Sequence, residues 1–71
     1  MMPYQVRYYV CPKNSPSKGD WETYGTYERL SQALHTYKRI KGEMFYLNRV
    51  RKYSEVTRFQ LIQDGEVIAE C

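Results

Sequence analysis

The sequence predicts an α+β fold in which one helix packs on an antiparallel sheet, in the order β-β-α-β-β-β. Three observations carry this prediction. Polar and apolar residues alternate near both ends of the chain, apolar residues recur with helical spacing in the middle, and Asp64-Gly65 marks a tight hairpin turn. Because the chain has 71 residues, we expect residues 1–71 to form one domain with a small core.

The first two strands are predicted over residues 4–10 and 21–27. The segment YQVRYYV alternates between two faces and is rich in β-branched and aromatic residues, which is typical of a strand. Pro12 ends this strand because proline cannot donate a hydrogen bond to the next one. Residues 11–20, with two prolines and a glycine, are predicted to form a slack surface loop.

A helix is predicted to begin near Leu30, where the spacing of the apolar residues changes from two to about 3.6. Gly42 is the residue type that most often follows the end of a helix, so we expect the helix to stop there. Cations in the last turn complement the helix dipole, which accounts for three basic residues without any ligand. The apolar stripe consists of Leu30, Ala33, Leu34, Tyr37 and Ile40, and the cations are Lys38, Arg39 and Lys41.

Three further strands are predicted after Gly42. Residues 44–53 and 56–63 would form a hairpin around a two-residue turn at Ser54-Glu55. The last hairpin turns at Asp64-Gly65, a pair that suits a type I′ turn. With this turn, the predicted pairs are Ile62 with Val67, Leu61 with Ile68, and Gln60 with Ala69.

The hairpin over residues 48–58 carries the candidate binding residues. If Ser54-Glu55 is a two-residue turn, Arg51 lies directly opposite Arg58, and like charges across paired strands are mildly destabilising. A three-residue turn would shift the register and separate the two arginines. A sequence selected for folding alone would favour an acid at one of the two positions, so the pair suggests an anionic partner. Guanidinium groups suit both carboxylates and phosphates. The candidate partner-binding residues are Arg49, Arg51, Lys52, Tyr53 and Arg58.

The distribution of charge supports an anionic partner but leaves an alternative open. The net charge of +3 is concentrated in residues 38–58, which hold seven Lys and Arg and two acids, whereas residues 59–71 hold three acids and no base. The alternative is a solvent-exposed sheet face that is kept soluble by its charges and guards a strand edge against aggregation.

Three hypotheses about partners follow. The leading one is a non-enzymatic binding module that docks on a protein, as an accessory or inhibitory factor, for instance of phage or mobile-element origin. Tyrosine and arginine, which this chain uses heavily, often dominate the energy of protein interfaces. The second is a nucleic-acid-binding protein that uses the basic hairpin 48–58; the sequence pI of 9.0 is at the threshold for this class. The third is a homodimer through a tyrosine-bearing sheet face.

The sequence offers no catalytic residue, metal site or cofactor site. His35 is the only histidine, and no nucleophile or carboxylate is spaced to act with it. Cys11 and Cys71 lack the spacing of a zinc site, and the four glycines form no phosphate-binding loop. We therefore expect no enzyme, no cofactor and no metal. Without an apolar run or signal peptide, we also expect no membrane association and a cytoplasmic protein with reduced thiols.

Overall fold

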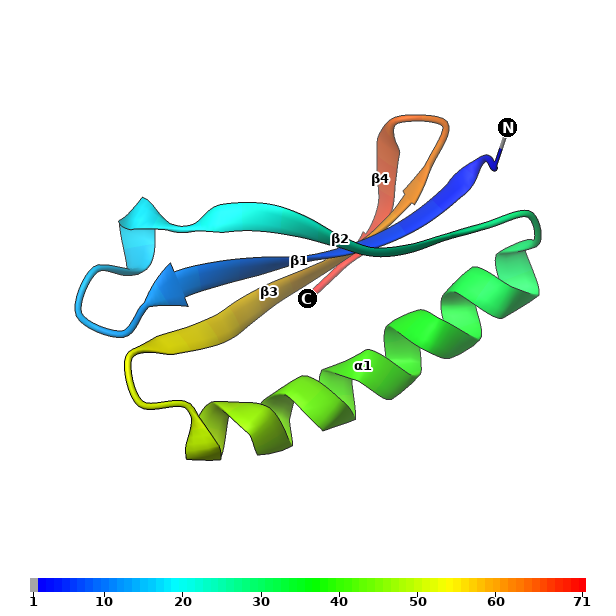
Figure 1. Cartoon of the computed structure of the whole chain (residues 1–71). Coiled ribbons are helices and arrows are strands. Elements are labelled where there is room, and N and C mark those ends of the chain that lie inside the picture. The colour runs from blue at the N-terminus through cyan, green and yellow to red at the C-terminus, as the bar shows by residue number, and fades with distance from the viewer. Residues whose placement is uncertain (1) are drawn as a thin grey trace.

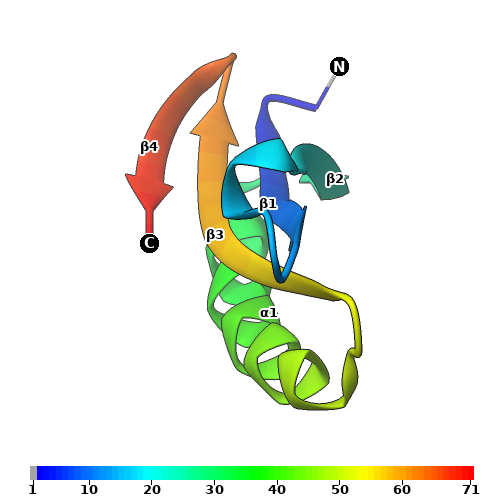
Figure 2. The same cartoon turned by 90° about the vertical axis from the view of Figure 1, so that its left-hand side faces the viewer.

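The computed structural model describes residues 2–71. Four strands form one antiparallel sheet in the order β2-β1-β3-β4, and the helix α1 lies across one face of it (Figures 1 and 2). The predicted α+β class, with a helix packed on an antiparallel sheet, is confirmed. Along the chain the elements are β1 (Tyr4–Pro12), the 3-10 turn η1 (Pro16–Lys18), β2 (Asp20–Tyr27), α1 (Leu30–Val50), β3 (Ser54–Gln63) and β4 (Glu66–Glu70).

The loop between β1 and β2 is shorter than the sequence predicts, and hydrogen bonds hold it against the sheet. β1 continues to Pro12, and η1 folds back toward the end of β1. The Tyr9 hydroxyl joins the two, because it accepts a hydrogen bond from the Gly19 amide (2.8 Å) and donates to the carbonyl of Pro16 (3.1 Å). The loop is thus tied to the sheet, and the thiol-bearing Cys11 beside it is buried.

The C-terminal hairpin turns where the sequence predicts. Asp64 and Gly65 both have positive φ, 49° and 85°, as a type I′ turn requires, and Ile62 faces Val67 as expected. Beyond this pair a β-bulge places one extra residue in β4. Two predicted pairs are therefore wrong: Leu61 faces Ala69, not Ile68, and Gln60 faces Glu70, not Ala69.

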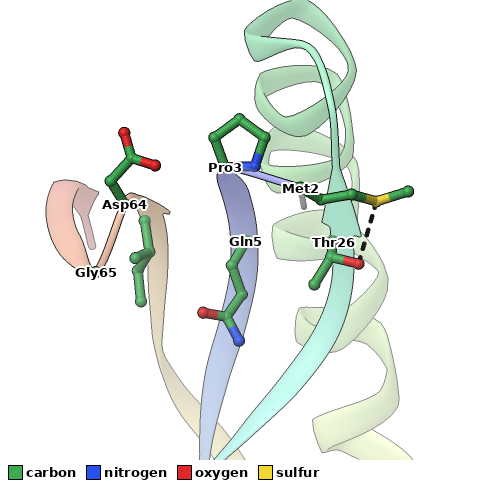
Figure 3. Close-up of a pocket in the computed structure, with 7 residues that line it drawn as sticks. Met2, Pro3, Gln5, Thr26, Asp64 and Gly65 are labelled. Atoms are coloured by element: carbon green, nitrogen blue, oxygen red, sulfur yellow. Dashed lines mark hydrogen bonds between the residues drawn. The ribbon is translucent and has the colours of Figure 1, made fainter.

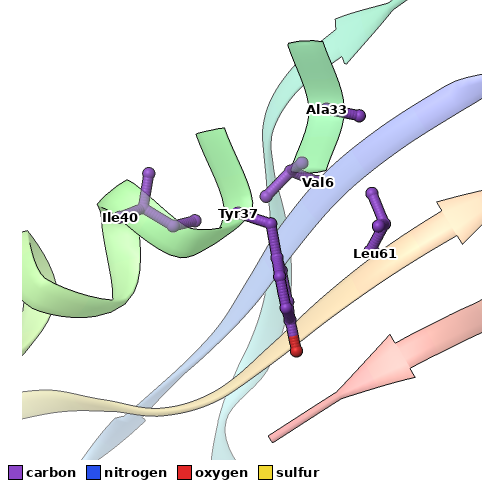
Figure 4. Close-up of a cluster of buried hydrophobic side chains, with 5 residues drawn as sticks. All are labelled: Val6, Ala33, Tyr37, Ile40 and Leu61. Atoms are coloured by element: carbon purple, nitrogen blue, oxygen red, sulfur yellow. The ribbon is translucent and has the colours of Figure 1, made fainter. Parts of the chain in front are cut away.

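The core lies between α1 and the two central strands. It is small, and burying each aliphatic side chain contributes roughly 1.5–3 kcal/mol, so every member matters in a chain of this size. Figure 4 shows the α1 side chains directed toward β1 and β3. The buried cluster consists of Val6, Ala33, Tyr37, Ile40 and Leu61.

The predicted strand over residues 44–53 is wrong, because α1 continues through Gly42 to Val50. Met44 lies one turn beyond Ile40 and is buried like it, so the apolar stripe carries the helix past the glycine. Ser54 and Glu55 consequently begin β3 instead of forming a turn. The order is β-β-α-β-β, and the hairpin over residues 48–58 does not exist.

Candidate docking surface

The predicted binding residues fall into two groups in the structure. Arg49 lies in the last turn of α1, and Arg51, Lys52 and Tyr53 form the connection from α1 to β3, all at one end of the molecule (Figure 1). Arg58 lies on β3, where its neighbour on β1 is Tyr9. The predicted pairing of Arg51 with Arg58 is wrong because residue 51 is not in a strand, so no repulsion between these two arginines needs compensation.

Arg58 lies on the sheet face that α1 leaves open, and its charge is offset by another residue of the chain. Its guanidinium pairs with the carboxylate of Glu70 and lies 5.2 Å from the ring centroid of Trp21. Arg7 lies 4.9 Å from the same ring, so Trp21 contacts two guanidinium groups. Gln60 is 6% exposed and accepts from Arg7 at 2.6 Å while donating to Glu70 at 2.5 Å.

This network also lowers the pKa of the Glu70 carboxyl. Hydrogen bonds from Arg58, and then from Gln60, hold the pKa of the Glu70 carboxyl below its usual value of 4.5. Both partners are present because the bulge in β4 places Glu70 opposite Gln60. On the open face, Glu70 thus offsets the charge of Arg58, while Arg7 is held by the neutral side chain of Gln60. Arg58 is therefore a weaker attractor for an anionic partner than an unpaired cation would be.

The other four residues belong to a surface that we call the basic tip. It comprises the last turns of α1 and the connection to β3. The apolar and aromatic side chains of this surface are unusually exposed to solvent. Phe45, Tyr46 and Val50 are 65%, 67% and 66% exposed, and Tyr53 is 76% exposed. The basic tip consists of Phe45, Tyr46, Arg49, Val50, Arg51, Lys52 and Tyr53.

Two contacts hold the basic tip against the sheet. The side chain of Asn48 binds the backbone of Val56, accepting from its amide (2.8 Å) and donating to its carbonyl (2.7 Å). The ammonium of Lys13 donates to the carbonyls of Asn48 and Arg51, where a cation also complements the negative end of the helix dipole. These contacts fix the end of the helix while leaving the aromatic and cationic side chains around it free.

Cations and aromatic rings alternate on the basic tip. The guanidinium of Arg49 lies 5.2 Å from the ring of Phe45, and the ammonium of Lys52 lies 5.6 Å from that of Tyr53. Residues 38–53 hold six of the eleven Lys and Arg and only one acid, Glu43. Such a surface can bind an anionic partner that also offers apolar area.

Arg51 differs from its neighbours on the basic tip because it is half-buried. Burial raises the pKa of Tyr8, the hydrogen bond from Tyr8 to Glu22 (2.9 Å) raises it further, and the charge of Arg51 acts in the opposite direction. The charge of Arg51 thus acts on a side chain of β1, whereas Arg49, Lys52 and Tyr53 are exposed.

The sequence prediction missed Phe45, Tyr46 and Val50. It assigned them to a strand, in which Phe45 would have shared a face with the arginines. The signal that could have corrected this is the spacing of Met44 from Ile40, which continues the helical stripe by one turn. With a helix through residue 50, all three side chains point away from the buried stripe.

A hollow of about 490 Å³ lies at the opposite end of the sheet (Figure 3). The amide of Gln5 donates to Thr23 (2.8 Å) and the hydroxyl of Thr26 donates to the sulfur of Met2 (3.4 Å), so both polar groups are engaged. Asp64 is the ionisable side chain among the lining residues. The hollow thus lacks the converging polar groups that fix a small ligand.

Within residues 2–71, no group of three or more His, Cys, Asp or Glu side chains is placed to hold a metal ion. Cys11 and Cys71 are both free thiols. The tyrosines of β1 mostly face α1: Tyr4 packs against the core, and only Tyr9 is directed to the open sheet face. In the described part of the chain, no helix is long and apolar enough to cross a membrane.

Comparison with known proteins adds no assignment. No family model matches the chain, and no curated protein or solved structure matches it either.

Proposed function

We propose that the chain is a non-enzymatic binding module that docks on a protein partner through the basic tip. The observation that carries the proposal is the exposure of Phe45, Tyr46 and Val50, each about two thirds accessible to solvent. An apolar patch of this kind on a small protein commonly marks an interaction site. Aromatic and arginine side chains at its centre are the types that most often dominate interface energy.

The basic tip supports a protein partner better than a purely electrostatic one. Burying Val50 and the rings of Phe45 and Tyr46 against a protein would be favourable because it removes apolar surface from water. Arg49 and Lys52 would favour a partner with acidic residues around that apolar contact. Arg58, on the open sheet face, has its charge offset by Glu70 and is not required by this mode of binding. A contribution of Arg58 stays a prediction, to be tested separately with Arg58→Gln.

Affinity capture followed by mass spectrometry, with and without nuclease, tests the proposal. We expect Phe45→Ser combined with Tyr53→Ser to reduce recovery of the specific partner about tenfold or more, since both are candidate anchors. Lys18→Ser, an exposed cation outside the basic tip, is the matched control and should bind as the wild type does. Equal recovery by the double variant and the wild type would refute the proposal.

The alternative function is nucleic-acid binding by the same surface. The six cations in residues 38–53, with aromatic rings between them, favour it because exposed rings can stack on bases while cations neutralise phosphates. Phosphate binding weakens steeply as salt rises, since each neutralised phosphate releases counterions. A partner lost on nuclease treatment, with such salt dependence, would favour this alternative.

We also propose a biological setting for the chain and keep a homodimer as a further possibility to test. An accessory or inhibitory factor of phage or mobile-element origin, acting in the cytoplasm, is the setting we propose; the free thiols Cys11 and Cys71 agree with a reducing compartment. A homodimer through a tyrosine-bearing sheet face would use Tyr9 beside Trp21 on the open face. Light scattering at high protein concentration distinguishes a monomer from this dimer.

A further inference from the structure

Gly42 lies inside α1, and among the described residues no neighbour requires a glycine at this position. Glycine is less favourable in a helix interior than any residue except proline. A Cβ built on Gly42 meets no atom within 4 Å among the described residues, and Gly42 is exposed. The fold would therefore accept alanine or a larger side chain at this position.

The neighbours of Gly42 turn the missing side chain into a hole on the helix surface. Residues three and four positions away in both directions are adjacent on a helix, and all four are exposed. Their positions surround Gly42 on the face of α1 opposite the buried stripe that contains Ile40. The four are Lys38 and Arg39 on one side, and Phe45 and Tyr46 on the other. The Arg39 guanidinium extends from there to the sheet, where it donates to the hydroxyl of Tyr24 on β2 (3.3 Å).

A hole bounded by four side chains is the feature that receives a side chain of another helix when two helices pack closely. With glycine at its floor, the hole also allows the backbone of the second helix to approach. Phe45 and Tyr46 supply apolar walls to such a contact. Val50, one turn beyond Tyr46, extends the apolar surface along the helix axis.

The charges around the hole select the occupant. Arg39 is paired with Glu43 at 3.6 Å, whereas Lys38, Lys41 and Arg49 have no acid among the described residues within ion-pair distance. A second copy of this chain would bring the same cations onto these, because a twofold contact places each surface against itself. Charge complementarity therefore favours an acidic partner over a homodimer.

We infer that this face of α1, centred on Gly42, binds an acidic amphipathic helix of a protein partner. An apolar side chain of the partner fills the hole between Phe45 and Tyr46, and its carboxylates pair with Lys38 and Arg49. A nucleic acid would use the cations but would gain nothing from the hole or from Val50. The inference rests on the proposed function and specifies the partner's chemistry.

The test uses the full chain and a synthetic fluorescent peptide of about 20 residues, with leucines on one helical stripe and glutamates beside it. The comparison ligands are the same peptide with lysine in place of glutamate, and single-stranded DNA of about 20 nucleotides. Fluorescence anisotropy gives Kd for the wild type, Gly42→Ala and Gly42→Leu. Gln32→Ala, on the exposed surface of the same helix away from the hole, is the control variant.

We expect the acidic peptide to bind, Gly42→Ala to raise Kd about threefold, and Gly42→Leu to raise it about tenfold or more. Thermal unfolding should show that neither variant is less stable, with Gly42→Ala raising Tm by about 4 °C. Lost binding then reflects the filled hole. Gln32→Ala should leave Kd unchanged.

Three results would overturn the inference: no binding of the acidic peptide, equal or tighter binding by Gly42→Leu, or tighter binding of the DNA than of the peptide. The proposed function is judged separately, from the capture experiment with the Phe45→Ser and Tyr53→Ser double variant. If that variant loses its partner while Gly42→Leu retains it, the basic tip binds a protein but the hole is not part of the site.

Discussion

The side chain of Asn48 hydrogen-bonds to both backbone groups of Val56, as a neighbouring strand would. The contact joins the last turn of α1 to the start of β3, eight residues later in the chain. Val56 is 3% exposed, so its amide and carbonyl would have little access to water if Asn48 were removed. The side chain of Asn48 thus fixes the position of the C-terminal turn of α1 against the start of β3.

We expect Asn48→Ala to destabilise the protein by about 2 kcal/mol, because two largely buried polar groups lose their partners. Asn48→Asp should also be destabilising, since a carboxylate can accept from the amide but cannot donate to the carbonyl. Urea unfolding followed by the fluorescence of Trp21 measures both. Asn14→Ala, in the exposed loop, is the control; a change below about 0.5 kcal/mol for Asn48→Ala would contradict the role assigned to this contact.

Much of the fold could be predicted from local patterns. The alternation in β1, the helical stripe from Leu30 and the turn at Asp64-Gly65 are all signals within a few residues of sequence, and the structure contains each element. The end of α1 has only a partial local signal, the spacing of Met44 from Ile40. Gly42 resembles a stop signal, and the contacts that override it are the burial of Met44 and the bond from Asn48 to Val56, which depend on tertiary packing.

The spatial grouping of the candidate binding residues could be predicted only in part. Arg49, Lys52 and Tyr53 could be identified from charge and residue type, and they do lie together. Arg58 was grouped with them through a hairpin that does not form. Its actual partners, Trp21 and Glu70, are far away in sequence, and Glu70 reaches it only because of the bulge in β4. A bulge of this kind has no reliable local signature.

The lowered pKa of Glu70 predicts how stability depends on acid. Because the folded state holds the pKa of this carboxyl below its usual 4.5, the stabilisation is fully present above about pH 4.5 and is lost as pH falls through the folded-state pKa. We expect the difference in free energy of unfolding between the wild type and Glu70→Gln to shrink below that pH. Urea titrations at several pH values measure it; a difference that does not depend on pH would be inconsistent with the ion pair to Arg58.

The buried Tyr37 predicts a loss of stability in alkali. Burial, and then the hydrogen bond from its hydroxyl to the Cys71 sulfur (3.3 Å), raise the pKa of Tyr37 well above its usual value of 10. Its contribution is fully present below about pH 10 and is lost as pH rises, because only the unfolded state then ionises readily.

We expect Tyr37→Phe to cost at most about 1 kcal/mol at neutral pH and to be less sensitive to alkali than the wild type. Unfolding measured by circular dichroism from pH 8 to 11 checks this. Tyr8, whose pKa is also raised, remains in the variant and should preserve part of the alkaline loss. Identical pH profiles for the two proteins would show that Tyr37 does not cause the effect.

Two adjacent residues of α1, Met44 and Phe45, should have different roles, the first in stability and the second in partner binding. Met44 is 7% exposed and Phe45 is 65% exposed, although they follow one another in the sequence. We expect Met44→Ala to cost about 2–3 kcal/mol through the cavity it leaves, and Phe45→Ala to change stability by less than about 0.5 kcal/mol. Urea unfolding measures both. A large loss for Phe45→Ala would mean that this ring supports the fold and is not free to serve a partner.

Gly19 and Gly42 differ in the space available for a side chain. A Cβ on Gly19 would lie 2.2 Å from the carbonyl oxygen of Val10 and 2.7 Å from a ring carbon of Tyr9, so the loop must move to accept one. A Cβ on Gly42 would lie more than 4 Å from every other described side chain.

We therefore expect Gly19→Ala to cost about 1–3 kcal/mol and Gly42→Ala to add up to about 1 kcal/mol of stability. Thermal and urea unfolding of the two variants, compared in one buffer, measure the opposite signs. If Gly42→Ala destabilised the protein, the glycine would have a role inside the fold, and its presence would no longer point to a partner.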